Sequence, residues 1–71
     1  MEIKLGKYRH FKGNEYEVIA LGKNSENPDE LLVVYKALYG EGDIWVRPLS
    51  MWRETVRVGD KTVPRFELIE E

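Results

Sequence analysis

Turn-forming residues recur along this sequence at intervals of roughly eight to twelve residues, and this spacing limits the fold more than any other feature. The segments between the turns are rich in valine, isoleucine, threonine and aromatic residues, which favour extended backbone. Short strands separated by glycine, proline and asparagine are typical of sandwiches and barrels. The sequence therefore predicts an all-β protein.

The turn residues also predict where the strands lie. Gly13 and Gly40 stand between apolar segments, and we expect both to adopt positive φ. Gly59-Asp60 predicts a two-residue hairpin turn, and residues 22–30 predict a polar loop. The extended segments are 7–11, 15–21, 31–38, 44–47, 55–58, 61–63 and 65–69, which we interpret as five or six short strands.

Three local patterns refine this prediction. In the second strand Tyr16, Val18 and Ala20 lie on one face and Ile19 and Leu21 on the other, and this change of apolar face midway along the strand indicates a bulge or a strong bend. The third strand is apolar on both faces at its start, which favours a central strand covered on both sides. Residues 49–54 are too short for an independent helix and predict one helical turn.

The predicted elements fit a small SH3-like barrel formed by a single domain, residues 1–71. Closing the sheet removes exposed strand edges, which a flat sheet of this size would leave at both sides. The alternative is an open, strongly bent sheet with the short helix packed on one face. Because Pro48 and Pro64 can keep a small barrel from closing, both a monomer and a weak edge-strand dimer stay open.

Composition excludes several classes of site. The chain has no cysteine and one histidine, so disulfides and thiolate zinc sites are excluded and an all-protein zinc site is disfavoured. We expect no metal and no cofactor. No apolar run has the length of a membrane-spanning helix or a signal-peptide core, so we expect a cytoplasmic protein with no membrane partner.

Charge is distributed as a mosaic. The net charge is −2, with positive segments at 1–13 and 47–65 and negative segments at 14–30 and at the C-terminal tail. Nucleic-acid-binding proteins usually carry a strong basic excess. The sequence therefore disfavours nucleic acid, unless folding brings the two basic segments together.

Aromatic and arginine residues form the main candidate site. A chain this small cannot bury every large ring, and Trp, Tyr and Arg are enriched at binding hot spots. We predict a recognition face on which Arg47 and Arg65 fix the polarity of the ligand. Its candidate residues are Tyr8, His10, Tyr35, Tyr39, Trp45, Arg47, Trp52 and Arg65. The alternative is that the tryptophans anchor the core and Arg47 stacks on a ring.

Catalytic interpretations are weaker. His10 has no nucleophile motif near it, and a strand histidine more often packs on an aromatic neighbour. Glu15 and Glu17 share a strand face and could act as paired carboxylates, but beside Lys7 or Arg9 they more often form a solvated ion pair. We therefore predict no catalytic residues.

Four motifs in order resemble a known family: residues 8–18, 34–40, 45–51 and 64–66. They are similar to the small bacterial family called domain of unknown function 1653, and the resemblance covers nearly the whole chain. It implies a bacterial, single-domain, intracellular protein with an SH3-like barrel and no assigned activity. Members often carry a histidine where this chain has Asn24, which is a small argument against catalysis here.

These observations favour a non-catalytic binding module that recognises a protein segment or peptide. The first alternative is a module that binds single-stranded RNA by stacking bases on exposed rings. The second, least favoured, is a small hydrolase-type enzyme or an accessory domain. The sequence does not name the ligand.

Overall fold

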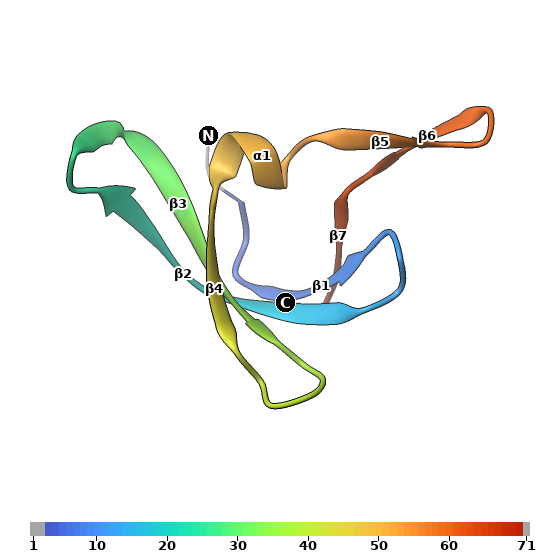
Figure 1. The fold of residues 1–71 in the computed structure, drawn as a ribbon, viewed down its shortest axis with the longest axis horizontal. Coiled ribbons are helices and arrows are strands. Elements are labelled where there is room, and N and C mark those ends of the chain that lie inside the picture. The colour runs from blue at the N-terminus through green and yellow to red at the C-terminus, as the bar shows by residue number, and fades with distance from the viewer. Residues whose placement is uncertain (1–2, 71) are drawn as a thin grey trace.

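A computed structural model describes residues 3–70 of the chain. Met1, Glu2 and Glu71, which the predicted domain includes, lie outside the described residues. The all-β class and the single short helix are confirmed. The elements are β1 (Gly6–His10), β2 (Glu15–Asn24), β3 (Asn27–Ala37), β4 (Ile44–Pro48), α1 (Leu49–Trp52), β5 (Thr55–Val58), β6 (Lys61–Pro64) and β7 (Phe66–Glu70) (Figure 1).

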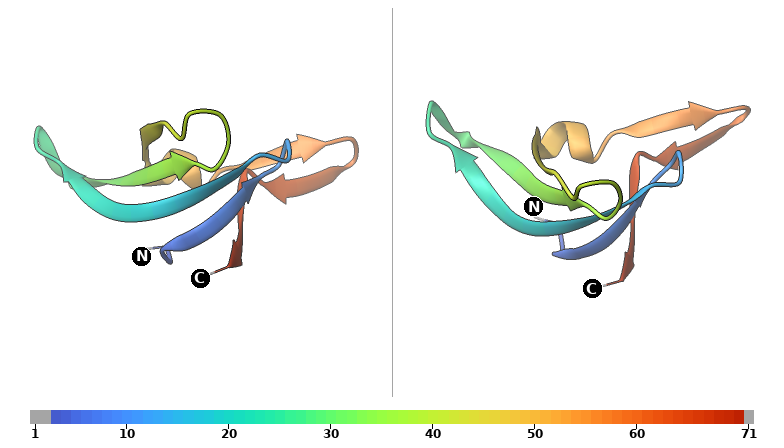
Figure 2. Two further views of the ribbon diagram at one scale, coloured as in Figure 1. Left: turned by 90° about the horizontal axis from the view of Figure 1, so that it is seen from below. Right: turned by 60° about the horizontal axis from the view of Figure 1, so that its bottom comes forward.

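The strands form two sheets. The larger has the order β4-β3-β2-β1-β7, and β5 and β6 form a separate hairpin. Figure 2 shows the curvature of the larger sheet and the β5–β6 hairpin extending away from it. The sheets do not close into a barrel, so the structure matches the open, bent alternative. Residues 3–70 form seven strands, more than the predicted five or six, because β6 and β7 separate at Arg65 and enter different sheets.

The predicted turns and the predicted bend are confirmed. Gly13 and Gly40 have φ of 111° and 60°. The register of β2 against β3 shifts between Val18 and Ala20, as the change of apolar face predicts. Because of this bulge, Val18 and Leu21 both pack against the core although they lie three positions apart, which would put them on opposite faces of a regular strand.

The predicted polar loop at 22–30 is wrong, because most of it continues the β2–β3 hairpin around a turn at residues 25–26. The side chain of Asn24 stabilises this turn. Its Oδ1 accepts from the Glu26 N–H at 2.9 Å and its Nδ2 donates to Glu30 Oε1 at 2.7 Å. Pro28 is tolerated because the β2–β3 register is irregular there.

The core lies on one face of the larger sheet, which we call the inner face, beneath α1. Val18, Val33, Leu49 and Trp52 are buried there. The opposite face, the outer face, is not covered, and Val34 of β3 is only half-buried. The expectation that both faces of the third strand are covered is therefore wrong, although β3 does lie between β2 and β4.

Candidate functional site

Cross-strand register places most of the predicted site residues on the inner face. Residues that are paired directly across strands share a face of the sheet. Tyr8 pairs with Tyr16, Tyr35 pairs with Trp45, and Val33 pairs with Arg47. His10 pairs with Phe66, whose ring is buried in the same core. The inner face is thus one aromatic surface assembled from β1, β2, β3, β4 and β7.

One part of this surface is sealed, and we call it the closed end: Tyr8, Tyr35, Trp52 and Phe66. Trp52 stacks on Phe66 with ring centroids 3.7 Å apart, and Tyr8 and Tyr35 meet Trp52 edge to face. Tyr8 and Tyr35 are each 6% exposed and Trp52 is 2% exposed. These three predicted ligand-binding residues therefore belong to the core.

The remaining predicted residues lie where the aromatic surface reaches solvent. We define the open end as His10, Tyr16, Tyr39, Trp45, Arg47 and Arg65. Five of these six were predicted from the sequence, and Tyr16 was not. The signal that could have identified Tyr16 is its position directly opposite Tyr8 in the predicted hairpin of the first two strands.

A series of tyrosines connects the two ends. The ring of Tyr16 lies 5.4 Å from Tyr35 and 5.5 Å from Tyr39, edge to face in both cases. The hydroxyls of Tyr16 and Tyr39 are 2.6 Å apart, which is a short hydrogen bond. Burial, together with this hydrogen bond to Tyr39, raises the pKa of Tyr16 to about 12. The half-exposed ring of Tyr39 is therefore held in place by a half-buried neighbour that packs against the core.

His10 is surrounded by rings and by cations. Its imidazole packs against Phe11, Tyr16 and Phe66. Burial lowers the pKa of His10, and the positive charges of Arg65, Lys12 and Arg47 lower it further. Folding therefore does bring cations from both basic segments of the sequence together around one residue.

The two arginines are held differently. Arg47 donates from Nε to the Tyr35 hydroxyl at 3.3 Å, and its guanidinium carbon lies 5.6 Å from the centre of the Phe66 ring. Arg65 donates to Glu54 Oε1 at 3.1 Å, and its backbone N–H also bonds to the Glu54 carbonyl. Arg47 thus stacks on a core ring, as the structural alternative predicts, and Arg65 is paired with a carboxylate.

Trp45 differs from Trp52 in its surroundings. It is 51% exposed. The aromatic pairs among residues 3–70 do not include it, although its partner across the strands is the buried Tyr35. Trp45 is therefore a large apolar group at the rim of the inner face.

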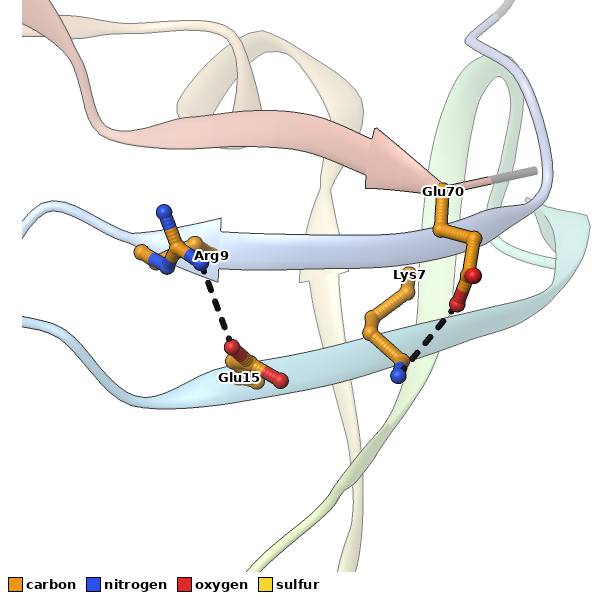
Figure 3. Close-up of polar contacts among 4 residues, drawn as sticks. All are labelled: Lys7, Arg9, Glu15 and Glu70. Carbon is orange, nitrogen blue, oxygen red and sulfur yellow. Dashed lines mark hydrogen bonds and ion pairs between the residues drawn. The ribbon is translucent and has the colours of Figure 1, made fainter.

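The outer face carries the carboxylates considered for catalysis. Arg9 Nη2 lies 3.4 Å from Glu15 Oε2 and Lys7 Nζ lies 3.3 Å from Glu70 Oε1, and both ion pairs are drawn in Figure 3. Glu17 pairs with Lys7 across the strands. These groups are solvent-exposed, so each pair contributes at most about 1 kcal/mol. The arrangement matches the solvated ion pairs that the sequence favours over paired catalytic carboxylates.

The surface of the described residues carries two shallow grooves. One, of about 320 Å³, runs past His10 and Phe11 toward Val63 and Pro64. The other, of about 360 Å³, lies between β3 and α1 and is lined by Asp29, Glu30, Leu31, Leu49, Ser50 and Arg53. Within residues 3–70, no three histidine or acidic side chains cluster as metal ligands would.

Comparison with known proteins now places this geometry in a family. The sequence model of DUF1653, described as a protein of unknown function, matches residues 6–68. The chain belongs to the DUF1653 family. A crystal structure of a DUF1653 protein from Bordetella bronchiseptica shares 35% sequence identity, and its TM-score is 0.86 over 97% of this chain and 90% of that one. A search of the curated proteins finds no match.

The DUF1653 match confirms the resemblance seen in the four sequence motifs, and it assigns no activity. Three of the motifs meet in the structure: residues 8–18, 45–51 and 64–66 all contribute rings or cations around His10. None of the helices in the described part of the chain is long and apolar enough to cross a membrane.

Proposed function

We propose that this DUF1653 protein is a non-catalytic binding module that recognises a short protein segment at the open end. The observation that carries the proposal is the tyrosine series from Tyr35 through Tyr16 to Tyr39, along which exposure rises from 6% to 46%. A ring anchored in this way offers apolar area to a ligand with little loss of conformational entropy on binding.

Charge selects the kind of segment. Besides burial, the positive charges of Arg65, Lys12 and Arg47 lower the pKa of His10, so cations gather at the open end although the chain carries a net charge of −2. Guanidinium groups beside rings suit a carboxylate flanked by apolar or aromatic side chains. The ligand class is therefore an acidic peptide with at least one bulky apolar residue.

Several features support a non-catalytic role. His10 Nδ1 accepts the Lys12 backbone N–H at 3.1 Å, and the neighbouring cations oppose its protonation. The Tyr16 hydroxyl, with its raised pKa, is a poor nucleophile. The turn that carries Asn24 lies at the far end of β2, about 30 Å along an extended strand from the residues nearest His10.

Single-stranded RNA is the second candidate. The cationic surroundings of His10 and the exposed rings of Tyr39 and Trp45 are the combination that stacks bases and binds phosphates. Binding of this kind weakens steeply with salt because counterions are released. Salt dependence therefore separates the two candidates.

The test is an amide NMR titration of the whole chain with an array of short acidic-aromatic peptides, and in parallel with oligouridine, at low and moderate salt. We expect shifts at residues 10, 16, 39, 45 and 47 with a subset of peptides, retained at moderate salt. Tyr39→Ala should weaken that binding, whereas Val58→Ala, which removes a half-exposed apolar side chain from β5, should not. If shifts appear with oligouridine alone and are lost at moderate salt, the ligand is RNA and the peptide proposal is wrong.

A further inference from the structure

The two edges of the five-stranded sheet differ in protection. β7 ends the sheet on one side and carries Glu67 and Glu70, and charged side chains discourage pairing between strand edges. β4 ends it on the other side, where Ile44, Trp45 and Val46 are 58%, 51% and 58% exposed. An exposed apolar edge strand is a template for another strand.

The hydrogen-bonding pattern shows which backbone N–H and C=O groups of β4 face the free edge. The Ala37 N–H bonds to the Asp43 carbonyl at 2.9 Å, and hydrogen-bonded and non-bonded residue pairs alternate along an antiparallel ladder. Trp45 and Arg47 therefore direct their backbone groups toward β3. Ile44 and Val46 direct their N–H and C=O groups away from β3, toward the free edge.

We propose that two copies of this chain pair through β4, antiparallel and centred on Trp45, so that one sheet continues across both copies. This register sets Ile44 of each copy opposite Val46 of the other, and it joins the outward N–H and C=O groups of both residues in hydrogen bonds. The inference does not rest on the proposed peptide ligand.

Neighbouring registers leave some of the outward backbone groups of Ile44 or Val46 without a free partner. A pairing centred on Val46 sets Ile44 opposite Pro48, which has no N–H. A pairing centred on Ile44 sets Val46 opposite Gly42, whose N–H already bonds to the Tyr39 carbonyl at 3.1 Å. The register centred on Trp45 is favoured because it avoids both losses.

Side chains suit the same register. On the inner face it sets Asp43 of one copy opposite Arg47 of the other, twice by symmetry, and the two Trp45 rings side by side. On the outer face, Val46 follows the cross-strand row formed by Ala20 and Val34, and Ile44 of the second copy extends that apolar row. Opposite charges on one face and apolar contacts on the other identify a second copy as the occupant of this edge.

The contact is short, so the dimer should form reversibly. β4 has five residues, which places the buried area at the low end for specific complexes, below about 1,200 Å². We expect monomer and dimer to exchange over micromolar to millimolar chain concentrations.

Sedimentation of the chain over that range tests the association, and NMR of a sample mixed from two isotope labels tests the register. The expected result is a mass that rises toward twice that of the chain, with inter-copy contacts between the Trp45 α-protons and between Ile44 and Val46 amides. A single species of monomer mass up to millimolar concentration would overturn the proposal. A peptide that pairs as an added strand with β4 of a monomeric chain would overturn it as well.

Two variants test the interface, so that the test still works if one of them does not fold. Val46→Pro removes an N–H that faces away from β3 and should raise the dimer dissociation constant at least about tenfold. Asp43→Lys places a cation opposite Arg47 and should also weaken the dimer. Asp60→Lys makes the same charge change in the β5–β6 turn and should leave it unchanged. If Val46→Pro does not fold, Asp43→Lys decides, and a dimer that Asp43→Lys leaves as tight as the parent would contradict the proposal.

Discussion

The closed and open ends of the inner face contain the same kinds of residue and differ in what covers them. At the closed end, α1 brings Trp52 onto Phe66 and seals Tyr8 and Tyr35. At the open end nothing comparable covers Trp45 and Tyr39, which stay about half exposed. Residue type alone thus decides little, and the position of one helical turn separates core from surface. The predictions below test how sharp that separation is.

The largest effect is expected at the closed end. Trp52→Ala removes the ring that stacks on Phe66, and truncating a buried tryptophan costs about 3–5 kcal/mol of unfolding free energy. That loss is comparable with the whole stability of a domain of this size. Thermal or urea unfolding followed by circular dichroism measures it.

Trp52→Phe is the matched control. It keeps an aromatic ring on Phe66 and removes the indole N–H, which is buried without a hydrogen-bond partner within residues 3–70. Its loss of stability should be clearly smaller than that of Trp52→Ala. Equal losses would mean that stacking does not hold the closed end together.

The next effect concerns the turns that border the open end. Gly13→Val and Gly40→Val should each cost more than about 1 kcal/mol, because both glycines have positive φ that a β-branched residue rarely adopts. A Cβ would meet no atom within 4 Å at either position, so the cost lies in the backbone alone. Chemical denaturation of each variant gives the change.

Gly22→Ala is the control for these turns. A Cβ there also meets no atom within 4 Å, and the backbone of Gly22 is not in the positive-φ region. Its stability should stay within about 0.5 kcal/mol of the parent. Unchanged melting temperatures for both Val variants would show that the turns carry no such constraint.

Acidification should affect the open end through His10. Because the pKa of His10 is lowered from 6.5 in the folded chain, the unfolded chain binds the proton first. Stability is therefore complete above the unfolded pKa and falls as the pH drops below it toward the folded pKa. Unfolding free energies between about pH 7.5 and 5.5 measure the slope, and an NMR titration of the imidazole should place its pKa below 6.5.

His10→Gln should flatten that slope, because glutamine does not titrate. The carboxylates contribute mainly below this range and act as the background in both proteins. A variant with the parent's full slope would assign the pH dependence to other groups, and the cations around His10 would then have no thermodynamic consequence.

The smallest effect on stability is expected for Trp45→Ala. The side chain is 51% exposed, and exposed substitutions usually change stability by less than about 0.5 kcal/mol. The same variant should weaken peptide binding in the titration described above. Unfolding of Trp45→Ala would place Trp45 in the core, and the contrast with Trp52 would disappear.

Local patterns were enough to predict much of the fold. The change of apolar face midway along the second strand indicated the bulge, and the glycine turns indicated most strand ends. The 22–30 segment was missed because its composition is that of a loop, whereas Asn24 satisfies the backbone of a tight turn through its side chain. An Asx turn of this kind is a local signal, but the polar composition around it concealed the strands on either side.

The candidate site was only half predictable for a related reason. Burial depends on which segment covers a residue, and the sequence does not show that α1 covers Tyr8 and Tyr35 and leaves Trp45 free. The gathering of Lys12, Arg47 and Arg65 around His10 also depends on three strands or turns meeting. Contacts between distant segments set both features.

The pairing of β1 with β7 has a consequence for the order of folding. In the larger sheet the other neighbours are consecutive strands, whereas this ladder joins residues 7–10 to residues 66–70. The β1–β4 meander can form from nearby segments, but β7 must close a loop of most of the chain, and such closure is slow. Since β7 delivers Phe66 to Trp52, the aromatic core should be completed in the last step, and mutations there should act mainly on the unfolding rate.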